Sequence, residues 1–211
     1  MQGRDATWYL TYLADTIRRT VLATVDGQGR PSTAAIDMMD ADERGLYFLT
    51  ARGKGLYRRL SSNPWVAVTG MAGKDTMSSV AVSVRGRVEE LGPSLLPRLF
   101  AKNPFMRDIY PSEESRKALT TYRICAGTGE WFDLSKHPIE RADFSWGGAK
   151  GAPGDVYRVA PDLCSGCGRC LAVCPQACIT MTGHVARIEP EHCLRCGRCQ
   201  EVCPFGAVTR A

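Results

Sequence analysis

Eight of the ten cysteines lie in the last third of the chain, in two runs of identical spacing. Each run reads C-x2-C-x2-C-x3-C-P, and the second run begins 29 residues after the first. The runs consist of Cys164, Cys167, Cys170 and Cys174, followed by Pro175, and of Cys193, Cys196, Cys199 and Cys203, followed by Pro204. This repeat restricts the C-terminal fold more than any other feature, because the fold must gather eight thiols into compact groups.

The spacing is typical of proteins with two 4Fe–4S clusters, in which the fourth cysteine of each run ligates the other cluster. Soft thiolates select iron–sulfur clusters or zinc over hard cations. Zinc and disulfides are the alternatives, but two triplet-plus-one runs fit a four-ligand zinc site poorly. We expect one cluster on Cys164, Cys167, Cys170 and Cys203, and the other on Cys193, Cys196, Cys199 and Cys174.

Composition restricts the compartment and the partners. Cluster ligands must be reduced thiols, so we expect a cytoplasmic protein. The first 19 residues lack the form of a signal peptide, and no segment reaches the roughly 20 apolar residues of a membrane span. The formal charge of +5 counts cysteines as neutral; two clusters bring the total to about +1. We therefore expect no nucleic-acid binding and no membrane span.

Residues 1–146 show short apolar runs that are separated by turn residues, which predicts a β-barrel or sandwich with peripheral helices. The Asp26-Gly27 pair is a strong hairpin signal. We expect helices at 6–19, 56–61, 93–102 and 112–119, and an irregular stretch at 104–110. We expect strands at 20–25, 31–39, 46–50, 65–71, 80–89, 121–126, 130–134 and 139–146, with turns at 40–45 and at Gly127-Thr128-Gly129.

Residues 147–154 contain four glycines and predict a flexible linker. This gives domains at 1–146 and 155–211. The second domain is predicted to be a small α+β, ferredoxin-like unit with strands at 156–159, 179–181, 185–188 and 207–209. It is too short for a large core, so it should depend on its clusters for stability.

One basic turn precedes an expected helix. The glycines beside Arg52 and Lys54 let backbone amides and the two cations converge ahead of a helix N-terminus, a combination that favours a phosphate group. A solvated basic loop is the alternative.

Four stretches that begin at Val21, Leu46, Leu60 and Val84 resemble the pyridoxamine 5′-phosphate oxidase-like FMN-binding split barrels, over about residues 18–146. Residues 155–211 resemble the bacterial two-cluster ferredoxins. The resemblance implies a split barrel that forms a homodimer with FMN at each subunit interface, although such barrels also accept deazaflavin or haem. It implies flavin contacts from Ala34, Ala35, Ile36, Leu49, Thr50, Arg52, Gly53 and Lys54.

Together these observations predict an iron–sulfur flavoprotein that carries electrons between 4Fe–4S clusters and FMN. We expect an oxidoreductase that reduces a small substrate and exchanges electrons with a redox partner protein or a small-molecule donor or acceptor. The alternatives are a non-catalytic electron carrier or redox sensor, and a protein whose barrel holds no flavin. Residues 129–141 and Met38-Met39 depart from the true oxidases, which argues against oxidation of a vitamin phosphate. Cys125 is interpreted as a packing residue. Cys178, which aligns with Ala207 across the 29-residue repeat, is interpreted as a packing residue too, with contact to the surroundings of a cluster as the alternative. His192 is a candidate to tune a cluster.

Overall fold

The computed structural model describes residues 3–151 and 156–210, and its contacts divide the chain into two compact units. The first unit comprises Met1–Ala72, Ala81–Glu130 and Phe144–Lys150. The second comprises Gly73–Val80, Trp131–Asp143 and Gly151–Ala211. The predicted linker at 147–154 lies partly outside the described residues, and the predicted domain boundaries stay a prediction.

The first unit is built on one eight-stranded sheet with the order β2-β1-β5-β6-β7-β4-β3, in which β8 also pairs with β7. The described strands form an open path and do not close into a ring by hydrogen bonds, as in a split barrel. The predicted fold class is confirmed. The strands are β1 (Arg19–Val25), β2 (Pro31–Asp37), β3 (Asp40–Asp42), β4 (Gly45–Ala51), β5 (Trp65–Ala72), β6 (Val80–Gly92), β7 (Leu119–Asp133) and β8 (Glu140–Trp146).

The hairpin of β1 and β2 forms where the Asp-Gly signal predicted it. The Asp26 carboxylate accepts the backbone N–H groups of Gln28 and Arg30, both at 2.9 Å, and closes the turn. The strands then pair without a break from Val25 opposite Pro31 to Arg19 opposite Asp37. The end of the predicted strand at Met38 and Met39 turns inward instead, and both methionines are buried.

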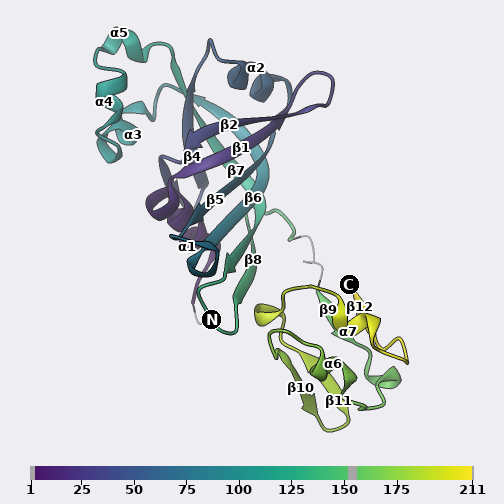
Figure 1. Ribbon diagram of the computed structural model, residues 1–211. Coiled ribbons are helices and arrows are strands. Elements are labelled where there is room, and N and C mark those ends of the chain that lie inside the picture. Colours follow the sequence, from purple (N-terminus) through teal and green to yellow (C-terminus); the bar gives the residue numbers. More distant parts are fainter. Residues whose placement is uncertain (1–2, 152–155, 211) are drawn as a thin grey trace. The chain divides into compact units, whose positions relative to one another are not determined.

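The helices cover the ends of this sheet. α1 (Ala6–Thr11) continues as the π-helix η1 (Tyr12–Ile17), so the predicted helix exists but loosens halfway. α2 (Gly55–Ser62) packs against β1 and β4. α3 (Leu96–Lys102), α4 (Met106–Ile109) and α5 (Glu113–Arg116) gather at one end of the unit (Figure 1). The stretch predicted as irregular therefore contains the short helix α4, and the helix predicted over 112–119 ends at Arg116.

The prediction of two strands joined by a glycine turn at residues 127–129 was wrong, because β7 runs unbroken through it. These glycines serve close packing instead of chain reversal. A Cβ on Gly127 would lie 2.4 Å from the Arg85 carbonyl oxygen and 2.7 Å from the Trp146 ring, and one on Gly129 would lie 2.3 Å from the Phe144 ring. The stretch 40–45, predicted as a turn, contains β3.

The second unit contains two antiparallel strand pairs, and all four predicted C-terminal strands are present. β9 (Tyr157–Val159) pairs with β12 (Val208–Arg210), and β10 (Ile179–Thr182) pairs with β11 (Val185–Ile188). Each cysteine run has one short helix around its third cysteine: α6 (Arg169–Ala172) contains Cys170, and α7 (Arg198–Glu201) contains Cys199. No helix in the described part of the chain is both long and apolar enough to cross a membrane.

Candidate cofactor sites

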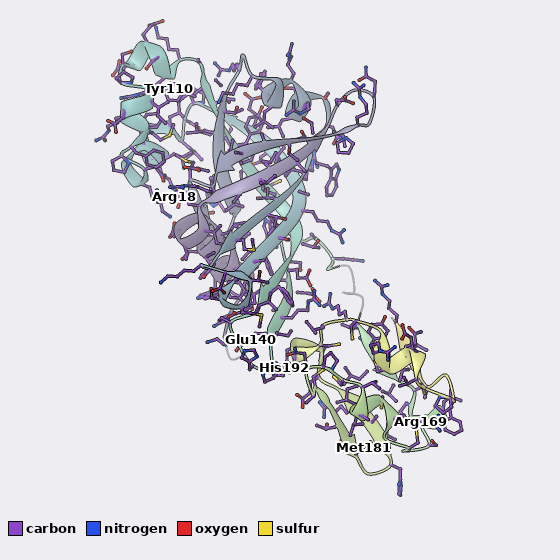
Figure 2. All side chains as sticks on the ribbon, viewed as in Figure 1. Arg18, Tyr110, Glu140, Arg169, Met181 and His192 are labelled. Atoms are coloured by element: carbon purple, nitrogen blue, oxygen red, sulfur yellow. The ribbon has the colours of Figure 1, made fainter. Side chains whose placement is uncertain are left out.

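The first candidate site is a cavity of ≈ 360 Å³, including space open to solvent, that is lined by four cysteine side chains. Three come from the first run and the fourth comes from the second, and they are Cys164, Cys167, Cys170 and Cys203. Arg169 and Met181, which Figure 2 labels, line the same cavity. The thiols of the first predicted group therefore meet around one space.

The second candidate site has the complementary set. Its cavity of ≈ 330 Å³, measured in the same way, is lined by Cys174 from the first run together with Cys193, Cys196 and Cys199 from the second. The structure thus brings together both groups that the spacing predicted, with the fourth cysteine exchanged between the runs. Among the described residues, no trio of His, Cys, Asp or Glu is placed to hold a single metal ion. Ligation itself stays a prediction.

In each cysteine run, a glycine and a short helix reverse the direction of the chain. Gly168 and Gly197 adopt left-handed backbone angles, with φ of 71° and 82°, immediately before α6 and α7. Few residues other than glycine tolerate this region, so these positions let the chain reverse between the second and third cysteines. Because the two runs fold alike, each presents three thiols on the inside of one bend.

Backbone N–H groups aim at several of the sulfurs. Arg195 N–H donates to Cys193 Sγ, and Ala207 N–H donates to Cys203 Sγ, each at 3.3 Å. The backbone N–H of Arg169 holds the pKa of the Cys167 thiol below its usual range. Burial acts in the opposite direction on Cys199 and raises its pKa to about 11. A metal centre deprotonates its thiol ligands, so this donor set fits two iron–sulfur clusters.

A ninth cysteine shares the second cavity. Cys178 is 3% exposed, and its Sγ lies 3.5 Å from Cys174 Sγ. In the first cavity Ala207 occupies the matching place, 29 positions later. The sequence did not single out Cys178 as a site residue. The other cysteine outside the runs, Cys125, is half-buried and donates to the Arg87 carbonyl.

The segment 131–143 of the second unit contacts residues next to the second cavity. His192 Nδ1 lies 2.8 Å from the Ile139 carbonyl oxygen, and Ile139 N–H donates to Gln176 Oε1 at 3.0 Å. Arg141 donates to the Cys193 carbonyl at 3.3 Å. Figure 2 labels His192 and the neighbouring Glu140. No local sequence signal identified Ile139 or Arg141, because these contacts join residues 37 to 53 positions apart.

The predicted phosphate turn lies between β4 and α2. Arg52, Gly53 and Lys54 are exposed, and α2 begins without a side-chain cap on its first N–H groups. Arg52 donates to the Lys117 carbonyl at 3.0 Å, which fixes its side chain beside the turn. A cationic turn that opens an uncapped helix suits an anionic phosphate.

The other predicted flavin contacts fall in two places. Leu49 and Thr50 are buried on β4, and the Thr50 hydroxyl has no hydrogen-bond partner among the described residues. Ala34, Ala35 and Ile36 lie on β2, at the opposite end of the strand order. An orphaned hydroxyl next to the phosphate turn fits a bound polar group, and the assignment of these residues to a flavin stays a prediction.

Comparisons with known proteins match two separate parts of the chain. Residues 13–131 match the family of pyridoxamine 5′-phosphate oxidases, and residues 163–207 match the 4Fe–4S dicluster domain. A pyridoxine/pyridoxamine 5′-phosphate oxidase from Mannheimia succiniciproducens is 29% identical over 67% of this chain and 63% of its own length. A dihydrophenazinedicarboxylate synthase from Pseudomonas chlororaphis is 31% identical over 46% of this chain and 45% of its own length.

Among solved structures, a NimC/NimA family protein from Clostridium acetobutylicum superposes with a TM-score of 0.55 and 16% identity, over 67% of this chain and 94% of that one. This likeness concerns the fold alone. The chain spans 63% and 45% of the length of the two curated relatives. Because the family match extends over more than half of its residues, the chain belongs to the pyridoxamine 5′-phosphate oxidase family, and it carries a 4Fe–4S dicluster domain after the family's sheet.

Proposed function

We propose that this protein is an FMN-dependent oxidoreductase that receives electrons through two 4Fe–4S clusters and reduces a small substrate. The observation that carries the proposal is the presence, in one chain, of a flavin-family sheet and of two four-thiol cavities. Clusters supply single electrons, whereas a flavin collects two and performs hydride chemistry. One chain that holds both keeps donor and acceptor at a high effective concentration.

In this proposal the flavin phosphate binds at the turn between β4 and α2. Arg52 and Lys54 provide positive charge, and the first N–H groups of α2 provide hydrogen-bond donors. The buried Thr50 hydroxyl, two positions before the turn, lacks a hydrogen-bond partner among the described residues. These residues would hold and orient the cofactor, and no residue of the chain is yet assigned to the reacting atoms of a substrate.

A second copy of the chain is the proposed partner in a homodimer. Val21, Trp65 and Met71 are 52%, 61% and 67% exposed. They share one face of the β1–β5 pair, because Val21 stands opposite Thr69 and alternate residues of β5 point outward. A cluster of large exposed apolar side chains marks an interaction surface. The same face includes Ala35 of β2, a predicted flavin contact.

The substrate is proposed only by class. The two curated relatives carry different activities in their names, one on a vitamin phosphate and one on a phenazine precursor. The family fold therefore does not decide the substrate, since function resides in the site and not in the fold. A small planar molecule that accepts two electrons suits a flavin at a subunit interface.

Anaerobic reduction of the purified full-length protein tests the proposal. A chemically reduced ferredoxin-type donor should bleach the flavin absorption, and it should do so more slowly in Cys167→Ala and Cys196→Ala variants. Glu43→Ala, at an exposed residue of the first unit, is the control. Bleaching of the clusters beside a flavin that stays oxidised contradicts the proposal, as does protein that retains no flavin.

A non-catalytic electron carrier is the second candidate. The exposed Cys167 and Cys196 favour it, because a thiol at the surface places cluster density within reach of another protein. Steady-state turnover with quinone, nitro-compound or flavin acceptors separates the two functions. Repeated turnover indicates an enzyme, and reduction that stops after one equivalent per site indicates a carrier.

A further inference from the structure

The two cysteine cavities differ at one position that the internal repeat makes directly comparable. When the two runs are aligned with an offset of 29 residues, Cys178 corresponds to Ala207. Each of these two residues lines the cavity of its own site. Both are buried, at 3% and 1% exposure. The first cavity therefore holds four thiols and the second holds five.

The fifth thiol lies beside the fourth ligand of its site. Cys178 Sγ is 3.5 Å from Cys174 Sγ, and the two cysteines are four residues apart. The backbone between them is tightly turned, since Ala177 N–H donates to the Cys174 carbonyl at 3.2 Å and Ala177 has a φ of 49°. This turn, which is rare for a residue with a side chain, keeps the two sulfurs together on the cavity wall.

Strand β10 fixes Cys178 from the other side. The Cys178 carbonyl accepts the Glu189 N–H at 2.9 Å, and the next residue, Ile179, pairs with Ile188 of β11. The position of Cys178 is thus set by the strand pair, whereas Cys174 is positioned by the end of the first cysteine run. We therefore expect that removal of one of these thiols leaves the element that holds the other in place.

We propose that Cys178 is an alternative fourth ligand of the second cluster and takes the place of Cys174 when Cys174 is lost. The inference rests on the proposed occupation of the cavities by 4Fe–4S clusters. In the exchange, the iron–sulfur bond to Cys174 is replaced by one to Cys178, whose thiol proton leaves to solvent. One thiolate replaces another, so the oxidation state and the total charge of the cluster stay the same.

The first site provides a matched control inside the same chain. Cys203 is its fourth ligand, and Ala207 offers no thiol to replace it. The Cys174→Ala variant should retain about eight irons per chain, as the wild-type protein should. Cys203→Ala should lose at least one iron from its cluster. The double variant Cys174→Ala/Cys178→Ala should behave at the second site as Cys203→Ala behaves at the first.

The measurements are iron and sulfide content and electron paramagnetic resonance of anaerobically purified full-length protein. Cys203→Ala and the double variant should show an oxidised three-iron signal or a lost cluster, and Cys174→Ala should show neither. Cys178→Ala alone should keep its full iron content, which verifies that the substitution is tolerated. A Cys174→Ala variant that loses iron as Cys203→Ala does overturns the inference, and so does a double variant that keeps both clusters.

One further variant and the iron content of the wild-type protein complete the test. Introducing the spare thiol into the first site, as Cys203→Ala/Ala207→Cys, should restore its iron if the position of the thiol is what matters, and failure to restore it counts against the inference. A wild-type protein without about eight irons contradicts the proposed cofactors themselves, and this result is read before any variant is compared.

Discussion

At the scale of single residues, the first prediction concerns the positive charge that Lys54 contributes to the proposed flavin phosphate site. Lys54 is exposed and stands immediately before α2. A charged group that contacts phosphate contributes about 1.5–3 kcal/mol. Lys54→Ala should therefore weaken FMN binding about tenfold or more, while binding of riboflavin, which lacks the phosphate, should change little. Fluorescence titration of the flavin-free protein with both ligands measures this. Lys74→Ala is the control, and equal losses for both flavins would disprove the phosphate contact.

A second residue-scale prediction concerns a buried carboxylate that joins β3 to α3. The Asp40 side chain is 6% exposed and receives hydrogen bonds from Arg98 at 2.7 Å and Lys102 at 2.6 Å. Asp40→Asn leaves both cations without this charge. Because the cations are themselves partly exposed, we expect a loss of about 1–3 kcal/mol, measured by urea unfolding. Glu43→Gln, on an exposed side chain, should change stability by less than about 0.5 kcal/mol.

At the scale of secondary-structure elements, β7 is the clearest case. It remains one strand because Gly127 allows the Arg85 carbonyl and the Trp146 ring to approach closely. The carbonyl belongs to the neighbouring strand and cannot rotate away. Gly127→Ala should therefore cost about 1–3 kcal/mol through overpacking, which a lower thermal midpoint will report. Thr128→Ala, on the adjacent position of the strand, is the control, and equal effects would show that packing at Gly127 is not the cause.

The elements of the second unit should depend on metal. Its described core is small and consists largely of cysteines and a few strand residues such as Ile179, Ile188 and Val208. Removal of iron by a chelator should abolish protection from hydrogen exchange in β9–β12, because ligand binding supplies folding free energy to so small a module. Protection in β1, β5 and β6 should persist, since these strands have their own core. Retained protection in β10 and β11 after iron loss would contradict this expectation.

At the scale of the whole molecule, one prediction concerns the exposed face of β1 and β5, which we propose as the interface between two copies. A Trp65→Glu substitution places a charge among large apolar side chains that would be buried between two copies. We expect the protein to shift from dimer to monomer, measured by light scattering at several concentrations. Met77→Glu, on an equally exposed side chain outside this face, should leave the mass unchanged. A Trp65→Glu protein that remains dimeric would exclude this face as the interface.

Periodicity and spacing were sufficient for much of this protein. The short apolar runs of β5 and β6, the Asp26-Gly27 hairpin and the two cysteine runs are local patterns, so each determines its own element or site. The grouping of thiols with an exchanged fourth cysteine also follows from sequence, because the spacing forces the chain away after the third thiol. Local patterns gave the wrong prediction at Gly127 and Gly129. These glycines are required because atoms of neighbouring strands pack closely against them.

Only the tertiary structure decided which distant residues share a surface. The sequence left Cys178 open between a packing residue and a neighbour of a cluster, and only the fold places its sulfur beside that of Cys174. The contact of Ile139 with His192 likewise joins positions 53 residues apart. Sequence determines the local period and the chemistry of each side chain, whereas contacts across long loops depend on how the strands pack, which no short stretch encodes.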